Sequence, residues 1–363
     1  MARQEPTLAA DGAVSLAERI WPAFEHIDTS SGALGAAVNR TLETLIPIIA
    51  NAPADRPVRN QWLDRLWQAV LEDGVNYLSP IEEAWGEICA SGEIASQWAD
   101  QILPLLRAAW SDPRPGNYVR GTDICLASLL AAGRHTELLE VLELKQRPIW
   151  PWRRYGIRSL RAQGMLDAAL AYAEASRGLN IPDWAIDAEC EETLLAAGCR
   201  REAYERYALT ANPANTGLSA FRQIAKKYPE VDPQRILRDL AEATGDPGRW
   251  FAAAKDAGHL DLALRFATTG RTDPKTLSRA SRDFLECDPV FALRIGRLAV
   301  ARILAGDGYE ITVPDLAGAG DHFLAAAERQ GMSADAQADL GKMLAAHPET
   351  PSFYRAPIMR RIR

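Results

Sequence analysis

Aspartate or asparagine stands directly before proline at six points of this chain, and this pairing constrains the fold more than any other feature. An aspartate side chain caps the first turn of a helix, and proline suits the first helical position because it needs no N–H partner there. Apolar residues recur at helical spacing elsewhere, as between Trp62 and Leu71. The pattern predicts about eighteen helices. The six pairs are Asp112-Pro113, Asn212-Pro213, Asp232-Pro233, Asp246-Pro247, Asp273-Pro274 and Asp288-Pro289.

One short stretch alternates with the period of a β-strand. Its apolar residues are Tyr309, Ile311 and Val313, and Pro314 follows at once. Because proline cannot donate to a strand ladder, we expect an extended loop here. The predicted fold class is therefore all-α, without significant sheet.

Four glycines mark a step that repeats along the chain. Each of Gly133, Gly164, Gly198 and Gly258 ends one helical segment, and another helical segment follows it. They are 31, 34 and 60 residues apart, and the last interval is close to two periods. A single core stops growing near about 250 to 300 residues, so an all-helical chain of 363 residues is expected to extend by stacking. The sequence predicts a solenoid of helical-hairpin repeats.

These residues resemble the tetratricopeptide repeat, in which a turn glycine is followed five residues later by alanine and then by a bulky apolar residue. Gly164 with Ala169 and Leu170 fits this pattern, as does Gly258 with Ala263 and Leu264. The resemblance covers about residues 130–267. It implies a scaffold with a concave groove that binds a peptide, a protein or occasionally a nucleic acid.

A second resemblance covers three short segments, which look like the C-terminal helical region of uncharacterised bacterial repeat proteins. This resemblance supplies no catalytic residue. The segments are 204–221, 226–229 and 250–255.

Three regions are expected along the chain. Residues 1–112 form an N-terminal helical region, residues 113–347 form the repeat region, and residues 348–363 form a basic C-terminal tail. The first boundary is placed at the turn-rich stretch 111–116, and the tail follows two prolines.

Composition excludes several classes of protein. The chain has 41 Lys plus Arg against 48 Asp plus Glu, a net charge of −7, which disfavours a general nucleic-acid coat. Its five cysteines are odd in number and form no CxxC pair, so we expect reduced thiols. We also find no secretory signal pattern and no run of about 18 apolar residues, and we expect a cytoplasmic protein without membrane contact.

The sequence shows no pattern typical of a cofactor, a metal or a catalytic centre. The five histidines never take a paired metal-ligand spacing, and phosphate-loop, dinucleotide and nucleophile-elbow motifs are missing. Glu82 with Glu83 and Glu191 with Glu192 are adjacent, about 100° apart on a helix, so we expect solvent-exposed faces. We expect no cofactor, no metal site and no catalytic residue, although an enzyme is not excluded.

The segment 145–161 is the most unusual in the chain, because it holds six basic residues and no acidic one. Arg154, Arg158 and Arg161 have the spacing of one helical stripe, and the aromatic residues Trp150 and Trp152 are interleaved. In one interpretation, this Arg/Trp cluster binds an acidic peptide, a phosphate group or single-stranded nucleic acid.

The other interpretation of the Arg/Trp cluster is structural. An acidic segment follows about thirty residues later, and stacked repeats would bring the two together. Arg154 or Arg158 would then pair with Asp187 or Glu191 inside the solenoid, with the tryptophans in the core. The sequence leaves both interpretations open.

Three functions are considered. The first is a non-catalytic scaffold or adaptor that binds a protein or peptide partner in its groove. The second is a nucleic-acid-associated solenoid that uses the Arg/Trp cluster together with Arg360, Arg361 and Arg363 of the tail. The third is an enzyme with a site assembled from distant repeats, for which Asp321, His322 and Glu328 are the candidates. The residues predicted to bind the partner are Trp150, Trp152, Arg153, Arg154, Arg158, Arg161, Tyr204 and Tyr207.

Overall fold

The computed structural model describes residues 5–24, 26–27, 32–112, 118–178 and 181–361. Within these ranges the regular structure consists of 21 α-helices and one 3₁₀ helix, without a strand, which confirms the all-α prediction. The count exceeds the expected eighteen partly because α4 (Ser79–Glu83) and α5 (Trp85–Ile88) are single turns, too short to show a periodic pattern. None of the described helices combines the length and apolarity needed to cross a bilayer.

The chain divides into two compact units, unit 1 (1–203) and unit 2 (204–363), and each is described by itself. This division lies inside the region 113–347 that the sequence assigned to the repeats. The boundary expected at 112/113 falls at residues 113–117, which lie outside the described residues.

Unit 1 contains α4 and α5 together with nine other helices, and α12 (Arg200–Ala211) begins at its end. The other nine are α1 (Pro6–Phe24), α2 (Ala33–Ala50), α3 (Arg56–Glu72), α6 (Gly92–Ser111), α7 (Thr122–Ala131), α8 (His135–Leu144), α9 (Trp150–Ala162), α10 (Leu166–Glu174) and α11 (Asp183–Ala196).

Unit 2 contains the 3₁₀ helix η1 (Pro247–Trp250) and nine α-helices. These are α13 (Gly217–Lys227), α14 (Pro233–Thr244), α15 (Phe251–Asp256), α16 (Leu260–Thr269), α17 (Pro274–Asp283), α18 (Pro289–Leu304), α19 (Val313–Arg329), α20 (Ser333–Ala346) and α21 (Ser352–Met359).

Four of the six predicted Asp-Pro or Asn-Pro pairs begin a helix, whereas after Asn212-Pro213 the next helix, α13, begins only at Gly217. The carboxylates of Asp232, Asp273 and Asp288 each accept an N–H from the first turn of the helix that starts at the following proline, at 2.9 to 3.1 Å. The four marker glycines all have left-handed backbone, with φ between +70° and +82°, a conformation that favours glycine. The stretch 309–312 is outside any helix, as expected.

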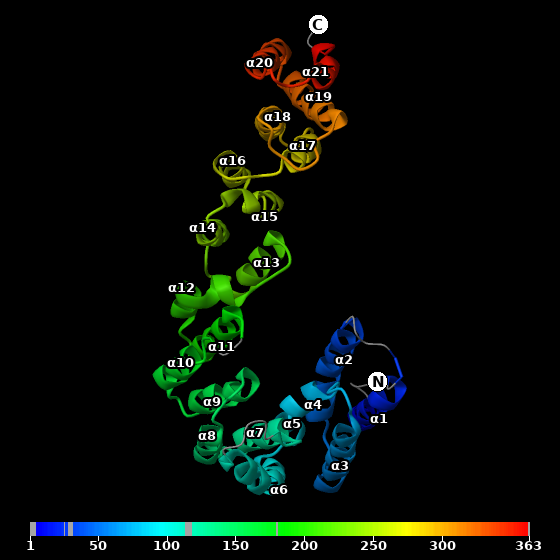
Figure 1. Cartoon of the computed structure of the whole chain (residues 1–363), viewed down its shortest axis with the longest axis vertical. Helices are drawn as coiled ribbons and strands as arrows, with labels where there is room; N and C mark the ends of the chain where they lie inside the picture. Colours follow the sequence, from blue (N-terminus) through cyan, green and yellow to red (C-terminus); the bar gives the residue numbers. More distant parts are fainter. Residues whose placement is uncertain (1–4, 25, 28–31, 113–117, 179–180, 362–363) are drawn as a thin grey trace. The chain divides into compact units, whose positions relative to one another are not determined.

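Helices in unit 1 contact both their neighbours in the chain and the helices next but one. The hairpin pairs α7/α8 and α9/α10 pack together, while α5, α7, α9 and α11 contact one another in that order. Figure 1 shows these helices succeeding one another along unit 1. We call α5, α7, α9 and α11 the inner row.

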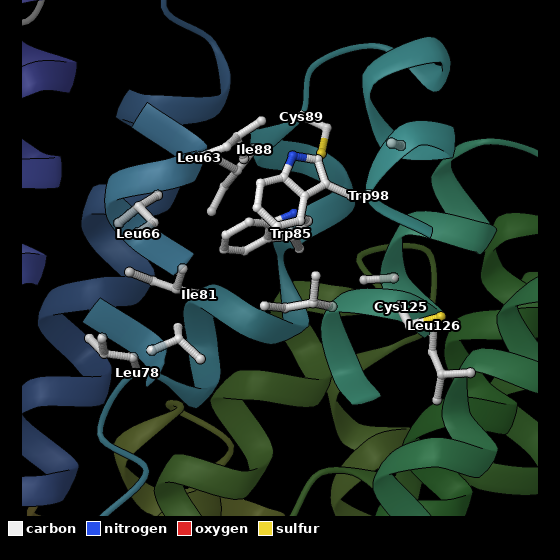
Figure 2. Close-up of a cluster of buried hydrophobic side chains, with 14 of the residues drawn as sticks. Leu63, Leu66, Leu78, Ile81, Trp85, Ile88, Cys89, Trp98, Cys125 and Leu126 are labelled. Carbon is white, nitrogen blue, oxygen red and sulfur yellow. The ribbon is translucent and has the colours of Figure 1, made fainter. Parts of the chain in front are cut away.

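Close packing at the start of the inner row depends on Gly86 of α5. A Cβ atom at this position would lie 2.6 Å from the carbonyl oxygen of Ala127 and 2.6 Å from the Ala131 side chain, both on α7. Beside it, Trp85 is fully buried and meets Trp98 edge to face, with ring centroids 4.9 Å apart. Figure 2 shows both indoles within the apolar cluster that anchors this end of the row.

The predicted tail is partly helical where it is described. α21 contacts α19, and its Ile358 is fully buried. The Tyr354 hydroxyl donates a hydrogen bond to the Ile311 carbonyl at 2.9 Å, and Arg361 pairs with Asp321. Arg363 lies outside the described residues. The packing of Ile358 was not expected from the basic composition of the tail.

A buried arginine joins three helices at the N-terminal end of unit 1. Arg59 on α3 is 3% exposed, and its guanidinium donates to the carbonyls of Ile49, Ala52 and Ile88 at 2.6 to 3.0 Å. These carbonyls lie at or beyond the ends of α2 and α5, where no intrahelical donor remains.

We predict that Arg59→Leu lowers the free energy of unfolding by about 3 kcal/mol, because the buried carbonyls of Ile49, Ala52 and Ile88 lose a charged donor. Urea unfolding followed by tryptophan fluorescence reports mainly on unit 1, since nine of the ten tryptophans lie there. Arg40→Leu, at an exposed position on α2, is the control and should shift the midpoint little. Equal midpoints for the two variants would contradict this role of Arg59.

Candidate functional site

The two tryptophans of the Arg/Trp cluster belong to the interior of unit 1. Helix α9 begins at Trp150 with Pro151 in its first turn, and Trp150 and Trp152 are 7% and 6% exposed. The Trp152 ring lies 4.9 Å from the Trp110 ring, and its Nε1 donates to Asp123 Oδ2 at 3.4 Å. Both indoles therefore expose little surface to a partner.

Arg153 faces the second helix of its own hairpin. Its guanidinium carbon lies 4.0 Å from the centre of the Tyr172 ring, and Nη2 donates to the Tyr172 carbonyl at 3.0 Å. Its Nε donates to the Ser176 hydroxyl. These contacts fix α9 against α10.

The three arginines of the predicted stripe all lie near carboxylates. Arg154 Nε and Arg158 Nε lie 3.4 and 3.1 Å from the carboxylate of Glu189 on α11, which is 5% exposed. Arg154 also reaches Glu83 at 3.4 Å, and Arg161 lies 3.2 Å from Glu192. Ion pairs between stacked helices, one of the two interpretations from the sequence, are thus present.

The carboxylates that pair with the stripe are not the ones expected. Asp187, expected to pair with the stripe, lies 2.5 Å from Arg177 instead. The helical phase of α11 turns Glu189 and Glu192, three residues apart, toward α9. Glu82 and Glu191 also differ from expectation, because they are 4% and 1% exposed rather than solvated.

A cleft of about 530 Å³ lies over the inner row. A second cleft of about 360 Å³ continues toward α2 and shares Glu83, Glu87 and Arg158 with the first, so we treat the two as one feature, the unit 1 groove. The first cleft is lined by Glu83, Gly86, Glu87, Ala127, Leu130, Ala131, Tyr155, Arg158, Arg161, Ala162 and Glu192. The second adds Asn39, Glu43, Ile46, Pro47, Ser79, Pro80 and Ala84.

Buried acidic groups lie close to the groove. Burial, with the charge of Asp123 next in effect, raises the pKa of Glu82 to about 7. Burial, with the charge of Glu83 next, raises the pKa of Asp123 to about 6. Tyr155 is 3% exposed, and burial together with Asp123 and Glu83 raises its pKa well above the ordinary value.

Tyr204 and Tyr207, the other predicted groove residues, belong to unit 2 and are 5% and 4% exposed. The Tyr204 hydroxyl donates to Asp239 at 2.6 Å, and Arg206 donates to the Tyr207 hydroxyl at 2.7 Å. The structure therefore brings together Arg154, Arg158 and Arg161 in unit 1. The two tyrosines belong to unit 2 and bind partners of their own there.

The residues considered for an enzyme have separate partners. Asp321 pairs with Arg361, and His322 Nδ1 lies 3.0 Å from the Ser278 hydroxyl. Burial lowers the pKa of His322. Across the described ranges, no group of three or more His, Cys, Asp or Glu side chains is arranged to hold a metal ion.

Sequence reasoning missed Glu83 and Glu87 as groove residues. They lie about seventy residues before the arginines that line the same groove. Neither the adjacent pair Glu82-Glu83 nor the single Glu87 forms a sequence pattern that predicts a binding site. A scan against protein-family models and a search of curated proteins find no match to this chain. The residues of the groove are therefore the basis for proposing a function.

We predict that Glu189→Gln lowers the free energy of unfolding by about 2 to 3 kcal/mol, because two partly buried guanidinium groups lose one buried counter-charge. Glu192→Gln is the matched control on the same helix, and its side chain is 59% exposed. Glu192→Gln should lower the free energy of unfolding by less than about 1 kcal/mol. Urea unfolding of both variants measures the difference, and similar losses for the two would contradict the role of Glu189.

The raised pKa of Glu82 predicts a pH dependence. The unfolded glutamate ionises near about 4.3, whereas in the fold its pKa is about 7. The folded state thus holds the proton more tightly, and stability falls as pH rises from about 4.3 to 7. We expect Glu82→Gln to reduce the loss of unfolding free energy between pH 5 and pH 8 by on the order of 2 kcal/mol. Glu140→Gln, exposed on α8, should retain the wild-type profile, and an unchanged profile in Glu82→Gln would refute the assignment.

Proposed function

We propose that this protein is a non-catalytic helical-repeat scaffold that holds an extended peptide segment of a partner protein in the unit 1 groove. One observation carries the proposal: a continuous groove crosses four successive helices of the inner row and reaches α2. Helical repeats commonly present such concave surfaces to extended ligands.

The packing of unit 1 supports a repeat of the tetratricopeptide kind. Gly133, Gly164 and Gly198 each turn the chain from an inner-row helix into the second helix of a hairpin with the same left-handed backbone. Ala169, five residues after Gly164, is fully buried on α10, which suits a small residue where paired helices meet. In the proposed solenoid, the inner-row helices form the binding face.

The residues that line the groove suit a peptide. Small side chains line its middle, namely Ala127 and Ala131 on α7 and Ala162 on α9, and leave room for an occupant. Charged side chains border them on α5, α9 and α11. A peptide backbone with a few charged side chains would be complementary to such a lining.

A nucleic-acid ligand has weaker support. Phosphate recognition needs cationic side chains that can contact the phosphate oxygens directly, but Arg154, Arg158 and Arg161 each lie within 3.4 Å of a carboxylate. In the tail, Arg361 is paired with Asp321. The nucleic-acid alternative therefore lacks an observation that favours it over the peptide.

A reducing compartment such as the cytoplasm is part of this proposal. Cys89 and Cys125 are fully buried as free thiols. Burial raises the pKa of each thiol to about 12, so neither is a ready nucleophile at neutral pH.

We predict that selection from a phage-displayed library of random peptides on the full-length protein enriches peptides that occupy the groove. Ala162→Trp places a large side chain at an exposed groove position at the end of α9. Enriched peptides should bind this variant at least about tenfold more weakly than the wild type, a loss of about 1.4 kcal/mol.

The control is Ala171→Trp, at an exposed position on α10 that lines neither cleft. It should bind the peptides like the wild type, and circular dichroism should show both variants folded. If selection enriches no peptide, or if the enriched peptides bind Ala162→Trp as tightly as the wild type, the proposed function is wrong.

A further inference from the structure

We infer that the peptide held in the unit 1 groove is basic, and that an Arg or Lys side chain of it lies against the carboxylates of Glu43 and Glu87. The inference rests on the proposed function and adds the chemistry of the partner. The inferred ligand is positively charged, whereas the arginine stripe in the sequence suggested a negatively charged one.

The charged side chains that line the groove are mostly acidic. Four are carboxylates, Glu43, Glu83, Glu87 and Glu192, and two are guanidinium groups, Arg158 and Arg161. The lining alone therefore carries a net charge of −2.

The guanidinium groups are already neutralised within unit 1. Arg158 pairs with Glu189 from beneath the groove, and Arg161 lies beside Glu192. Glu43 and Glu87 are exposed and have no ion pair among the described residues. An acidic ligand would have to displace Glu189 or Glu192 from the arginines, whereas a basic ligand finds two carboxylates available.

The groups behind the groove indicate a negative potential there. The charges of neighbouring carboxylates add to burial in raising the pKa values of Glu82, Asp123 and Tyr155. Tyr155 lines the groove and is buried, and its hydroxyl lies close to the Asp123 carboxylate.

The charge of the whole unit acts in the same direction. Residues 1–203 contain 19 Lys plus Arg against 28 Asp plus Glu, a net charge of −9, although the entire chain carries only −7. Such a field raises the association rate of a basic segment and repels an acidic one.

The test uses fluorescence anisotropy with the full chain and three labelled peptides of about ten residues, in which glycine alternates with Arg, Glu or Gln. We expect the Gly-Arg peptide alone to bind, with an affinity that falls as NaCl is raised. The double variant Glu43→Gln/Glu87→Gln should bind it about tenfold more weakly. The matched control is Glu72→Gln/Glu140→Gln, which removes the same charge at exposed positions outside the groove, and it should bind nearly like the wild type.

Other outcomes overturn the inference in distinguishable ways. If both double variants weaken binding equally, the Gly-Arg peptide is held by the general charge of unit 1 and not by the groove. If the Gly-Glu or Gly-Gln peptide binds instead and Ala162→Trp abolishes that binding, the groove holds peptides but the inferred charge is wrong. If no probe binds and the phage library also yields no ligand, the proposed function itself fails.

Discussion

The groove depends on how closely α5 lies against α7. Contact between these helices is set by Gly86, where a Cβ atom would come within 2.6 Å of the Ala127 carbonyl oxygen. Any larger side chain would move α5 away from α7. Glu87 lies on α5, and Glu83 is the last residue of α4, two positions before α5 begins. The close packing at Gly86 thus determines where Glu83 and Glu87 lie relative to the arginines of α9.

Ion pairing within the stack then decides what the groove offers a ligand. The buried carboxylate of Glu189 holds Arg154 and Arg158 together on the face of α9. Since a buried carboxylate is costly unless it is paired, these arginines are structural counter-ions first. The charges left over at the surface of the groove are those of Glu43 and Glu87. The arginine stripe, which is cationic in the sequence, therefore borders a groove whose lining carries a net negative charge in the fold.

Local features of the fold could be predicted from the sequence, because they depend on neighbouring residues. The aspartate caps at Asp232, Asp273 and Asp288 and the left-handed turn at Gly164 are determined within a few residues. The division of the chain at residue 203 was not predicted, since it depends on contacts among many helices. The packed helix α21 was missed because its few apolar residues lie among prolines and arginines.

The candidate site could be predicted only in part. The spacing of Arg154, Arg158 and Arg161 correctly placed them on one helical face, with acidic residues of a later helix, α11, nearby. Which acidic residues face them depends on the rotation of α11, and spacing along one chain does not give that rotation. Glu83 meets Arg154 across about seventy residues of sequence, a contact that arises only when the helices stack.

A crystal structure of the full chain with the Gly-Arg peptide tests the central claim most directly. The account predicts that the peptide lies along the inner row, with a guanidinium group beside Glu43 and Glu87 and with the Arg158–Glu189 ion pair intact. A peptide bound elsewhere on unit 1, or one that occupies the groove without contact to either glutamate, would contradict it.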